Sequence, residues 1–226
     1  QLERTRRGLE AAAHIQRSLL PRDLPDVPGA RFAWGFRPSD QLAGDVLGIV
    51  PLGPHQVGLY VGDVAGHGVP AALLSVTLSH WLAPTRVQSP LVRPAAEGTV
   101  GVVARPAQVA ESLSAQFPFD VRTGQYFTML YGVLDTRRMS WRFVLAGHPL
   151  PIHQPHGRAP RLLEASGFPI GIVPEARYDE VEVALGPGDR LFLYSDGIVD
   201  AQDGSGQEFG QVALLDTLAR AGAEPR

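Results

Sequence analysis

Three aspartates lie beside glycines at the ends of segments that are typical of β-strands: Asp45, Asp63 and Asp196. The first two belong to a pair of apolar segments separated by a turn near Pro54, a pattern that predicts a β-hairpin. Because side chains alternate between the two faces of a strand, Asp45 and Asp63 then lie opposite each other on one apolar face. Two carboxylates placed in this way must share a proton or bind a cation.

The register of this hairpin follows from its apolar residues. Large side chains at odd-numbered positions share one face in both arms, which pairs Ile49 with Leu59 and Leu47 with Val61. A slip of two residues keeps both aspartates on that face, and only an odd slip separates them.

Asp196 adds a third carboxylate, because it follows the apolar segment 189–195 and precedes Gly197. Oxygen ligands in a protein without cysteine suit a hard cation such as Mg²⁺ or Mn²⁺. The plainer alternative is that the aspartates only end strands and cap turns, and any one of them alone favours it. The three together, each next to a glycine, favour a metal site.

Segment 62–68, Gly-Asp-Val-Ala-Gly-His-Gly, leads directly into a predicted helix. Glycines let the backbone come close to a ligand, and a helix N-terminus favours anions such as phosphate. A strand-to-helix turn that needs two flexible residues explains the same glycines. His67 in this segment either donates a proton to a leaving group or is only a turn residue.

The composition excludes several kinds of chemistry. The 226 residues contain no cysteine, which excludes cysteine nucleophiles, disulfides and thiolate metal sites. All 20 residues counted as lysine or arginine are arginine, which excludes Schiff-base enzymes and the lysine of a Walker-type phosphate loop. A formal net charge of −3 argues against nucleic acid as the main partner. The sequence shows no membrane-spanning apolar stretch and no signal peptide, so we expect a cytoplasmic domain.

The pattern along the chain predicts an α+β fold with antiparallel sheets, because two blocks of strands are separated by helices. The spacing predicts helices at about 2–20, 69–82, 106–117 and 210–221. Strands are expected at about 30–36, 44–50, 56–63, 125–134, 140–147, 177–184 and 189–195. Residues 84–105 are rich in proline and glycine and are expected to form a loop or flap.

Several short motifs occur in a fixed order between about residues 11 and 213. The main ones are Gly44-Asp45, the segment 62–73, Ala146-Gly147-His148-Pro149 and Leu193-Tyr194-Ser195-Asp196-Gly197. Supporting ones are Ile15-Gln16 with Leu19-Leu20-Pro21, the segment 131–135 and the segment 206–210. Together they resemble the bacterial SpoIIE/RsbU-like branch of the metal-dependent type 2C (PPM) serine/threonine phosphatases.

The resemblance implies two antiparallel β-sheets packed as a sandwich and flanked by helices, a four-layer αββα fold. It divides the chain into an N-terminal linker helix over residues 1–22 and a phosphatase domain over residues 23–226. His148, between Gly147 and Pro149, is expected to anchor a turn.

The resemblance also implies a site for two Mg²⁺ or Mn²⁺ ions, where a metal-bridging water attacks a phosphoserine or phosphothreonine. Carried over by motif, Asp63 is the bridging carboxylate and the backbone carbonyl of Val64 binds one ion. Asp45 is an acidic ligand of that ion and Asp196 a ligand of the other. The set of expected catalytic residues is Asp63, Asp45, Asp196 and His67.

The chain departs from the family pattern at two places that concern metal binding. Gly48 stands where the pattern after the first aspartate usually has a second one. The family also carries an Asp-Asp motif on a late strand, and the given sequence reaches Arg226 without it. Asp216 lies in a helical pattern and is a poor substitute, so the C-terminal strand with the last metal ligand is expected to be missing.

The leading hypothesis is a phosphatase acting on a small phosphorylated anti-sigma-factor antagonist. The N-terminal helix is expected to couple an upstream sensor or a dimer partner to the helices at 69–82 and 106–117. The alternative is a catalytically weak or inactive phosphatase-fold module that binds a signalling partner. A metal-dependent nuclease would also use clustered carboxylates, but the sequence has no basic stripe.

Overall fold

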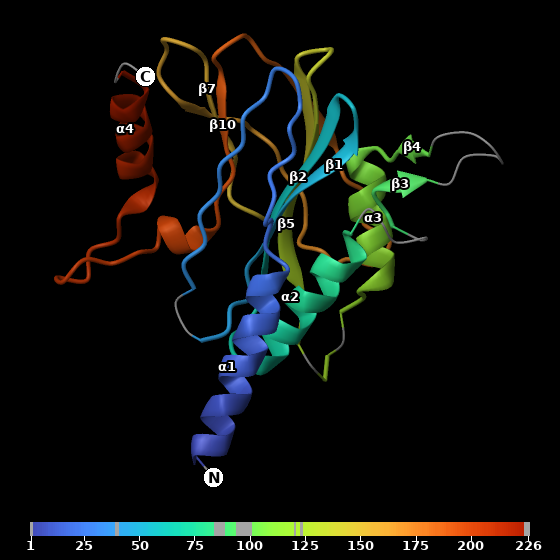
Figure 1. The fold of residues 1–226 in the computed structure, drawn as a ribbon, viewed down its shortest axis with the longest axis vertical. Coiled ribbons are helices and arrows are strands. Elements are labelled where there is room, and N and C mark those ends of the chain that lie inside the picture. Colours follow the sequence, from blue (N-terminus) through green and yellow to red (C-terminus); the bar gives the residue numbers. More distant parts are fainter. Residues whose placement is uncertain are drawn as a thin grey trace.

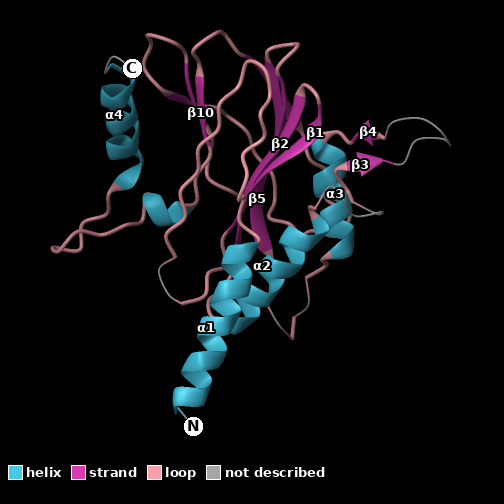
Figure 2. Cartoon of the chain, viewed as in Figure 1, coloured by secondary structure: helices cyan, strands magenta, loops and turns pink. Residues whose placement is uncertain are grey.

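The computed structural model describes residues 2–38, 41–83, 89–93, 101–119, 121–122 and 124–223. Two antiparallel sheets lie face to face, with helices α2 and α3 outside one sheet and α4 outside the other (Figures 1 and 2). This is the four-layer αββα arrangement that the family resemblance implies. None of the described helices combines the length and the apolar character that a membrane span needs.

The larger sheet is antiparallel throughout, with the strand order β1–β2–β5–β6–β9. Its strands are β1 (Val46–Gly53), β2 (Gln56–Val64), β5 (Phe127–Asp135), β6 (Ser140–Ala146) and β9 (Glu180–Ala184). β1 and β2 form the predicted hairpin, with Leu47 opposite Val61 and Ile49 opposite Leu59. The register expected from the apolar pattern is therefore confirmed.

Helices α2 (Val69–Trp81) and α3 (Pro106–Gln116) cover the outer face of this sheet. Each begins at a proline in its first turn, where the missing N–H is not needed for a helical hydrogen bond. Fully buried side chains from both helices and the sheet form the core here: Leu78, Val109, Leu113, Phe127 and Tyr131. Their burial holds the helices on the sheet.

The smaller sheet has the order β10–β7–β8, with β10 (Arg190–Phe192), β7 (Ile152–Gln154) and β8 (Arg161–Leu162). Helix α4 (Gly210–Ala223) lies against it: the Gln154 side chain donates to the Leu218 carbonyl and the Arg190 side chain to the Ala221 carbonyl, both over 3.3 Å. Between the sheets, Trp141 and Phe143 stack with ring centroids 4.3 Å apart.

The N-terminal helix α1 (Leu2–Ser18) agrees with the predicted one, and its N-terminal half projects away from the sheets (Figure 1). Its other half packs through Ala13 against Leu42 and against Ala72 of α2. The partly buried Leu9 and Ala12 of α1 pack against the same cluster.

Four sequence predictions about local structure need correction. Residues 30–36, predicted to be a strand, have no sheet partner in the described chain. The expected loop 84–105 contains the short strands β3 (Val92–Arg93) and β4 (Val102–Val103), and residues 84–88 and 94–100 lie outside the described residues. β7 and β8 were missed because strands of two or three residues show no alternation. The strands at 180–184 and 190–192 are shorter than predicted.

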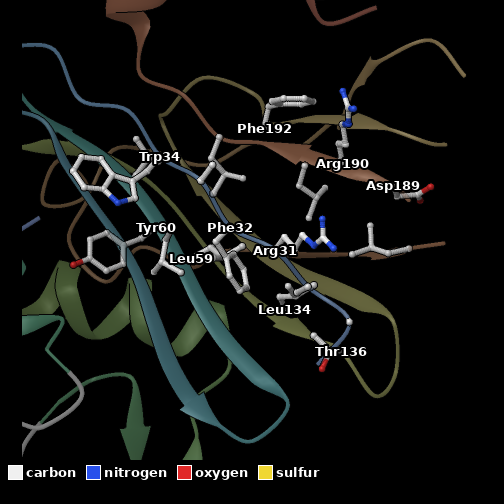
Figure 3. A pocket seen from close by; sticks show the side chains of 18 of the residues that line it. Arg31, Phe32, Trp34, Leu59, Tyr60, Leu134, Thr136, Asp189, Arg190 and Phe192 are labelled. Atoms are coloured by element: carbon white, nitrogen blue, oxygen red, sulfur yellow. The ribbon is translucent and has the colours of Figure 1, made fainter. Parts of the chain in front are cut away.

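A cavity of about 780 Å³ opens between the two sheets (Figure 3). Phe32 and Trp34 lie on one side of it, Leu59 and Leu134 on the larger sheet, and residues 185–193 along the smaller one. The odd-numbered face of β1 borders this cavity, so its side chains are only half-buried. The even-numbered face, which the sequence analysis did not single out, is buried more deeply against the helices.

Candidate active site

The structure brings Asp45, Asp63 and Asp196 to one end of the two sheets. Asp45 comes directly before β1, and continuing the β1–β2 register places it opposite Asp63, at the open end of the hairpin. Asp196 follows β10 of the smaller sheet and begins the 3₁₀ helix η1 (Asp196–Ile198). The Ser195 hydroxyl donates to Asp45 Oδ2 over 3.4 Å, so a hydrogen bond joins the two sheets at this end.

Burial and neighbouring carboxylates disfavour the charged forms of Asp45 and Asp63. Burial raises the pKa of Asp63 to about 7, and the negative charges of Asp45 and Asp196 contribute in the same direction. Burial also raises the pKa of Asp45; the hydrogen bond from Ser195 opposes this rise, and the charge of Asp196 adds to it. A site with this charge distribution favours a proton or a cation.

Gly44 leaves open space beside two oxygens that the sequence analysis named as ligands. A Cβ atom at this position would come within 2.7 Å of the Val64 carbonyl oxygen and 3.0 Å of Asp63 Oδ1. The Val64 amide also donates to the Gly44 carbonyl over 3.4 Å. Glycine is therefore required where the chain passes these oxygens, and a larger residue would occupy the space next to them.

The donor chemistry of the site fits a divalent cation. Carboxylate and carbonyl oxygens are the ligands that Mg²⁺ and Mn²⁺ prefer. Within the described part of the chain, however, no group of three or more acidic or histidine side chains converges closely enough to hold an ion. The three aspartates face one another across the site without forming a closed set of ligands.

His67, the fourth expected catalytic residue, lies outside this group of carboxylates, and so does Asp216, which the sequence analysis rated a poor substitute for a ligand. His67 is exposed in the turn before α2, between Gly66 (φ 95°) and Gly68 (φ 78°), where the backbone conformation itself favours glycine. Asp216 is exposed on α4 and is not among the charges that act on Asp63. Asp216 therefore remains a poor substitute for a further ligand.

The structure explains why Gly48 departs from the family pattern. Gly48 pairs directly with Tyr60 in the hairpin, and a Cβ atom at Gly48 would overlap the Tyr60 ring. Tyr60 belongs to the core under the helices, on the face of the sheet opposite Asp63. The missing aspartate therefore removes no ligand from the side on which the carboxylates meet.

Replacing Gly48 with alanine is expected to destabilise the protein by about 1–3 kcal/mol, because the Tyr60 ring must move out of its packed position. Thermal unfolding measures the effect. Gly53→Ala in the same strand is the matched control, since a Cβ atom there meets nothing within 4 Å. Equal stability of the two variants would contradict the packing explanation.

The sequence analysis missed Thr128 at this end of the site. Thr128 lies directly opposite Asp63 in the β2–β5 pairing, and its hydroxyl oxygen is 2.8 Å from Nδ1 of His148. The pairing joins strands that are far apart in the chain, and no local pattern gives its register. The hydrophobic alternation of β5 alone could only have placed Thr128 on one of two faces.

Gln16 connects α1 to the chain that carries Asp45. Its side-chain oxygen accepts from the Ala43 amide over 3.1 Å, and its side-chain nitrogen donates to the Ala43 carbonyl and to Ser75 Oγ, the latter over 2.8 Å. Gln16 is buried. Helix α1 therefore holds the backbone two residues before Asp45 and contacts α2 through the same side chain.

Comparisons with known proteins agree with this arrangement. The family model for Stage II sporulation protein E (SpoIIE) matches residues 53–226. The phosphoserine phosphatase RsbP of Bacillus subtilis (strain 168) is 27% identical over 204 residues, which cover 87% of this chain and 46% of RsbP. The phosphoserine phosphatase RsbU of the same strain is 24% identical over 199 residues, which cover 88% of this chain and 55% of RsbU. The chain spans about half the length of these relatives.

A solved structure with the same architecture is the SiaA-PP2C domain of Pseudomonas aeruginosa. It matches with a TM-score of 0.77 and 24% sequence identity, over 99% of this chain and 85% of the SiaA chain. This likeness confirms the predicted type 2C phosphatase fold.

Proposed function

Because this chain belongs to the SpoIIE family, we propose that it is a metal-dependent phosphatase that hydrolyses phosphoserine or phosphothreonine on a regulatory protein. One observation carries this proposal. Carboxylates from two different sheets face one another at one end of the fold, and their mutual repulsion, added to burial, raises the pKa of Asp63 to about 7.

In this proposal, Asp63, Asp45 and the Val64 carbonyl hold one Mg²⁺ or Mn²⁺ ion, and Asp63 and Asp196 hold a second. Bound ions of this kind lower the pKa of a coordinated water and neutralise charge on a phosphoryl group. Gly44 keeps the space beside Val64 and Asp63 open. No protein nucleophile is needed, which suits a chain without cysteine.

We assign His67 as the group that donates a proton to the leaving serine or threonine oxygen. Its exposed place in the turn after β2, four residues from Asp63, supports this assignment. The two glycines that flank it give the turn its left-handed conformations.

The proposed substrate is a small phosphorylated protein of the anti-sigma-factor antagonist type, in the cytoplasm. The names of the phosphoserine phosphatases RsbP and RsbU support the phosphoserine part of this proposal. We further propose that α1 receives the signal of an upstream sensor, or of a partner subunit in a homodimer. The contacts of Gln16 with Ala43 and Ser75 support a route from α1 to the site.

The second candidate function is a phosphatase-fold module that binds a signalling partner without turnover. The observation in its favour is that, among the described residues, the acidic side chains do not converge as a metal site. Binding to a partner that survives EDTA, without phosphate release, would identify this function.

Phosphate release from a phosphoserine protein and from an aryl phosphate, with Mn²⁺, with Mg²⁺ and with EDTA, tests the proposal. We expect turnover with Mn²⁺ or Mg²⁺ and only background release with EDTA, because the carboxylates do not supply a nucleophile themselves. Asp216→Asn is the matched control and should keep wild-type turnover, since Asp216 lies away from the site. Turnover that is unchanged by EDTA would contradict a metal-dependent mechanism.

A further inference from the structure

His148 lies in the interior between the two sheets and has no role in the proposed function so far. It follows Gly147, whose φ of 69° and close contact with the Pro169 ring require glycine. The His148 side chain is buried, and both of its ring nitrogens have partners. Nδ1 is 2.8 Å from Thr128 Oγ1, and Nε2 is 3.1 Å from the Tyr194 carbonyl oxygen.

The two partners determine which nitrogen of His148 carries the proton. A carbonyl oxygen only accepts hydrogen bonds, so Nε2 must donate to Tyr194. A neutral ring then has a lone pair on Nδ1, which accepts from the Thr128 hydroxyl. A doubly protonated ring would lose this second hydrogen bond unless the hydroxyl turned round, and burial lowers the pKa of His148 to about 4. The neutral ring is therefore the form that satisfies both contacts.

These contacts join the two sheets directly beside the carboxylates. Thr128 is in β5 of the larger sheet, where it pairs with Asp63. Tyr194 follows β10 of the smaller sheet and precedes Asp196 by two residues. The His148 ring therefore contacts Thr128, which pairs with Asp63 in the larger sheet. It also contacts the Tyr194 carbonyl, which lies two residues before Asp196 in the chain.

Among the described residues, a further hydrogen bond between the two sheets runs from Ser195 to Asp45 over 3.4 Å. That bond is longer, and it ends on a carboxylate whose charge changes when a cation or proton binds. The His148 contacts are shorter and involve no carboxylate. Neither contact of His148 therefore includes a group whose charge changes when the carboxylates gain a proton or a cation.

We propose that His148 is a positioning residue that fixes the distance between Asp63 and Asp196, and through it the affinity of the site for a divalent cation. This inference rests on the proposed function, because it assumes that the two aspartates bind cations. His148 acts through Thr128 and Tyr194 and does not contact the substrate. Outer residues that orient metal ligands typically change metal affinity by about 10- to 100-fold when they are replaced.

Three variants separate positioning from simple packing. His148→Phe fills a similar space but removes both hydrogen bonds. Thr128→Val removes only the hydroxyl and keeps the shape of the side chain, so it tests the same hydrogen bond without a change of ring in the core. His148→Gln keeps an N–H donor for Tyr194 and is the conservative replacement. His156→Gln is the control, because His156 is exposed.

The measurements are Mn²⁺ binding to the metal-free protein by titration calorimetry, and thermal unfolding in EDTA. We expect His148→Phe to weaken Mn²⁺ binding by about 10- to 100-fold and Thr128→Val by a smaller factor, with His148→Gln closer to the wild type. The ¹⁵N spectrum of labelled histidine should show the Nε2–H tautomer for His148. Each of these results supports the proposal.

The failure of this proposal is distinct from the failure of the proposed function. If wild-type protein binds Mn²⁺ and releases phosphate, while Thr128→Val and His148→Phe bind Mn²⁺ as tightly as the wild type, only the positioning role is overturned. An Nδ1–H tautomer would overturn it as well. If wild-type protein binds no Mn²⁺, both the proposed function and the positioning role are wrong.

Discussion

Asp63→Asn is expected to lower metal-dependent phosphate release by about 10³-fold or more, since a bound ion contributes several kcal/mol to the transition state. The same change is expected to stabilise the metal-free protein at neutral pH. Burial raises the pKa of Asp63, the charges of Asp45 and Asp196 raise it further, and the neutral amide carries no charge to be opposed by either cause. Loss of activity together with a gain in stability is expected when a residue that function requires destabilises the folded protein.

The sign of the pH dependence follows from the raised pKa. In the folded state the pKa of Asp63 is about 7, against an ordinary value of 3.8, so folding favours the protonated carboxyl. This contribution to stability is fully present below pH 3.8 and is lost as the pH rises through about 7. Metal-free wild-type protein should therefore melt at a lower temperature at pH 8 than at pH 5.5, and Asp63→Asn should show a smaller difference.

Thermal unfolding in EDTA at these two pH values, together with phosphate release in Mn²⁺, measures both parts of the effect. Asp216→Asn, an exposed position on α4, should behave as the wild type in both assays. An asparagine variant that keeps its turnover, or that melts below the wild type at pH 8, would refute the assignment of Asp63.

Gln16→Ala is expected to lower kcat/KM by on the order of 10- to 100-fold, because small displacements of groups near a reacting centre have effects of this size. The change leaves the Ala43 amide and carbonyl and the Ser75 hydroxyl without their Gln16 contacts. Unpaired buried polar groups cost about 1–3 kcal/mol, so the melting temperature should also fall.

Two further variants make this test specific to the hydrogen bonds of α1. Gln16→Glu keeps an acceptor for the Ala43 amide but removes the donor, so it should recover little activity. His14→Ala, at an exposed position of the same helix, should leave activity and stability unchanged. Wild-type kcat/KM in Gln16→Ala would show that α1 does not position the Asp45 backbone.

The part of the site that could be predicted from the sequence is the part formed by neighbouring segments. The hairpin register depends on the alternation of apolar residues across a short turn, and it alone places Asp45 opposite Asp63. The glycines at 66 and 68 indicate the turn into α2, because both have positive φ. The alternation of side chains along each strand is enough to predict the register of such a hairpin.

Contacts between distant segments could not be predicted in this way. The approach of Asp196 to the hairpin requires the packing of two sheets, and the pairing of Thr128 with Asp63 joins strands about 65 residues apart. For residues 30–36 the sequence predicts a strand that the structure does not contain. Their composition is typical of a strand, but a strand also needs a hydrogen-bonding partner. Pattern alone does not supply that partner.

The cavity between the sheets has a consequence for the behaviour of the protein at high concentration. β10 is the terminal strand of its sheet in the described chain, and its residue Leu191 lines the same cavity as Phe32 and Trp34. Unpaired strand edges next to apolar surface are the features that promote self-association into extended sheets. Arg31 and Arg190 also line this cavity, and we expect repulsion between these charges on neighbouring copies to oppose such association.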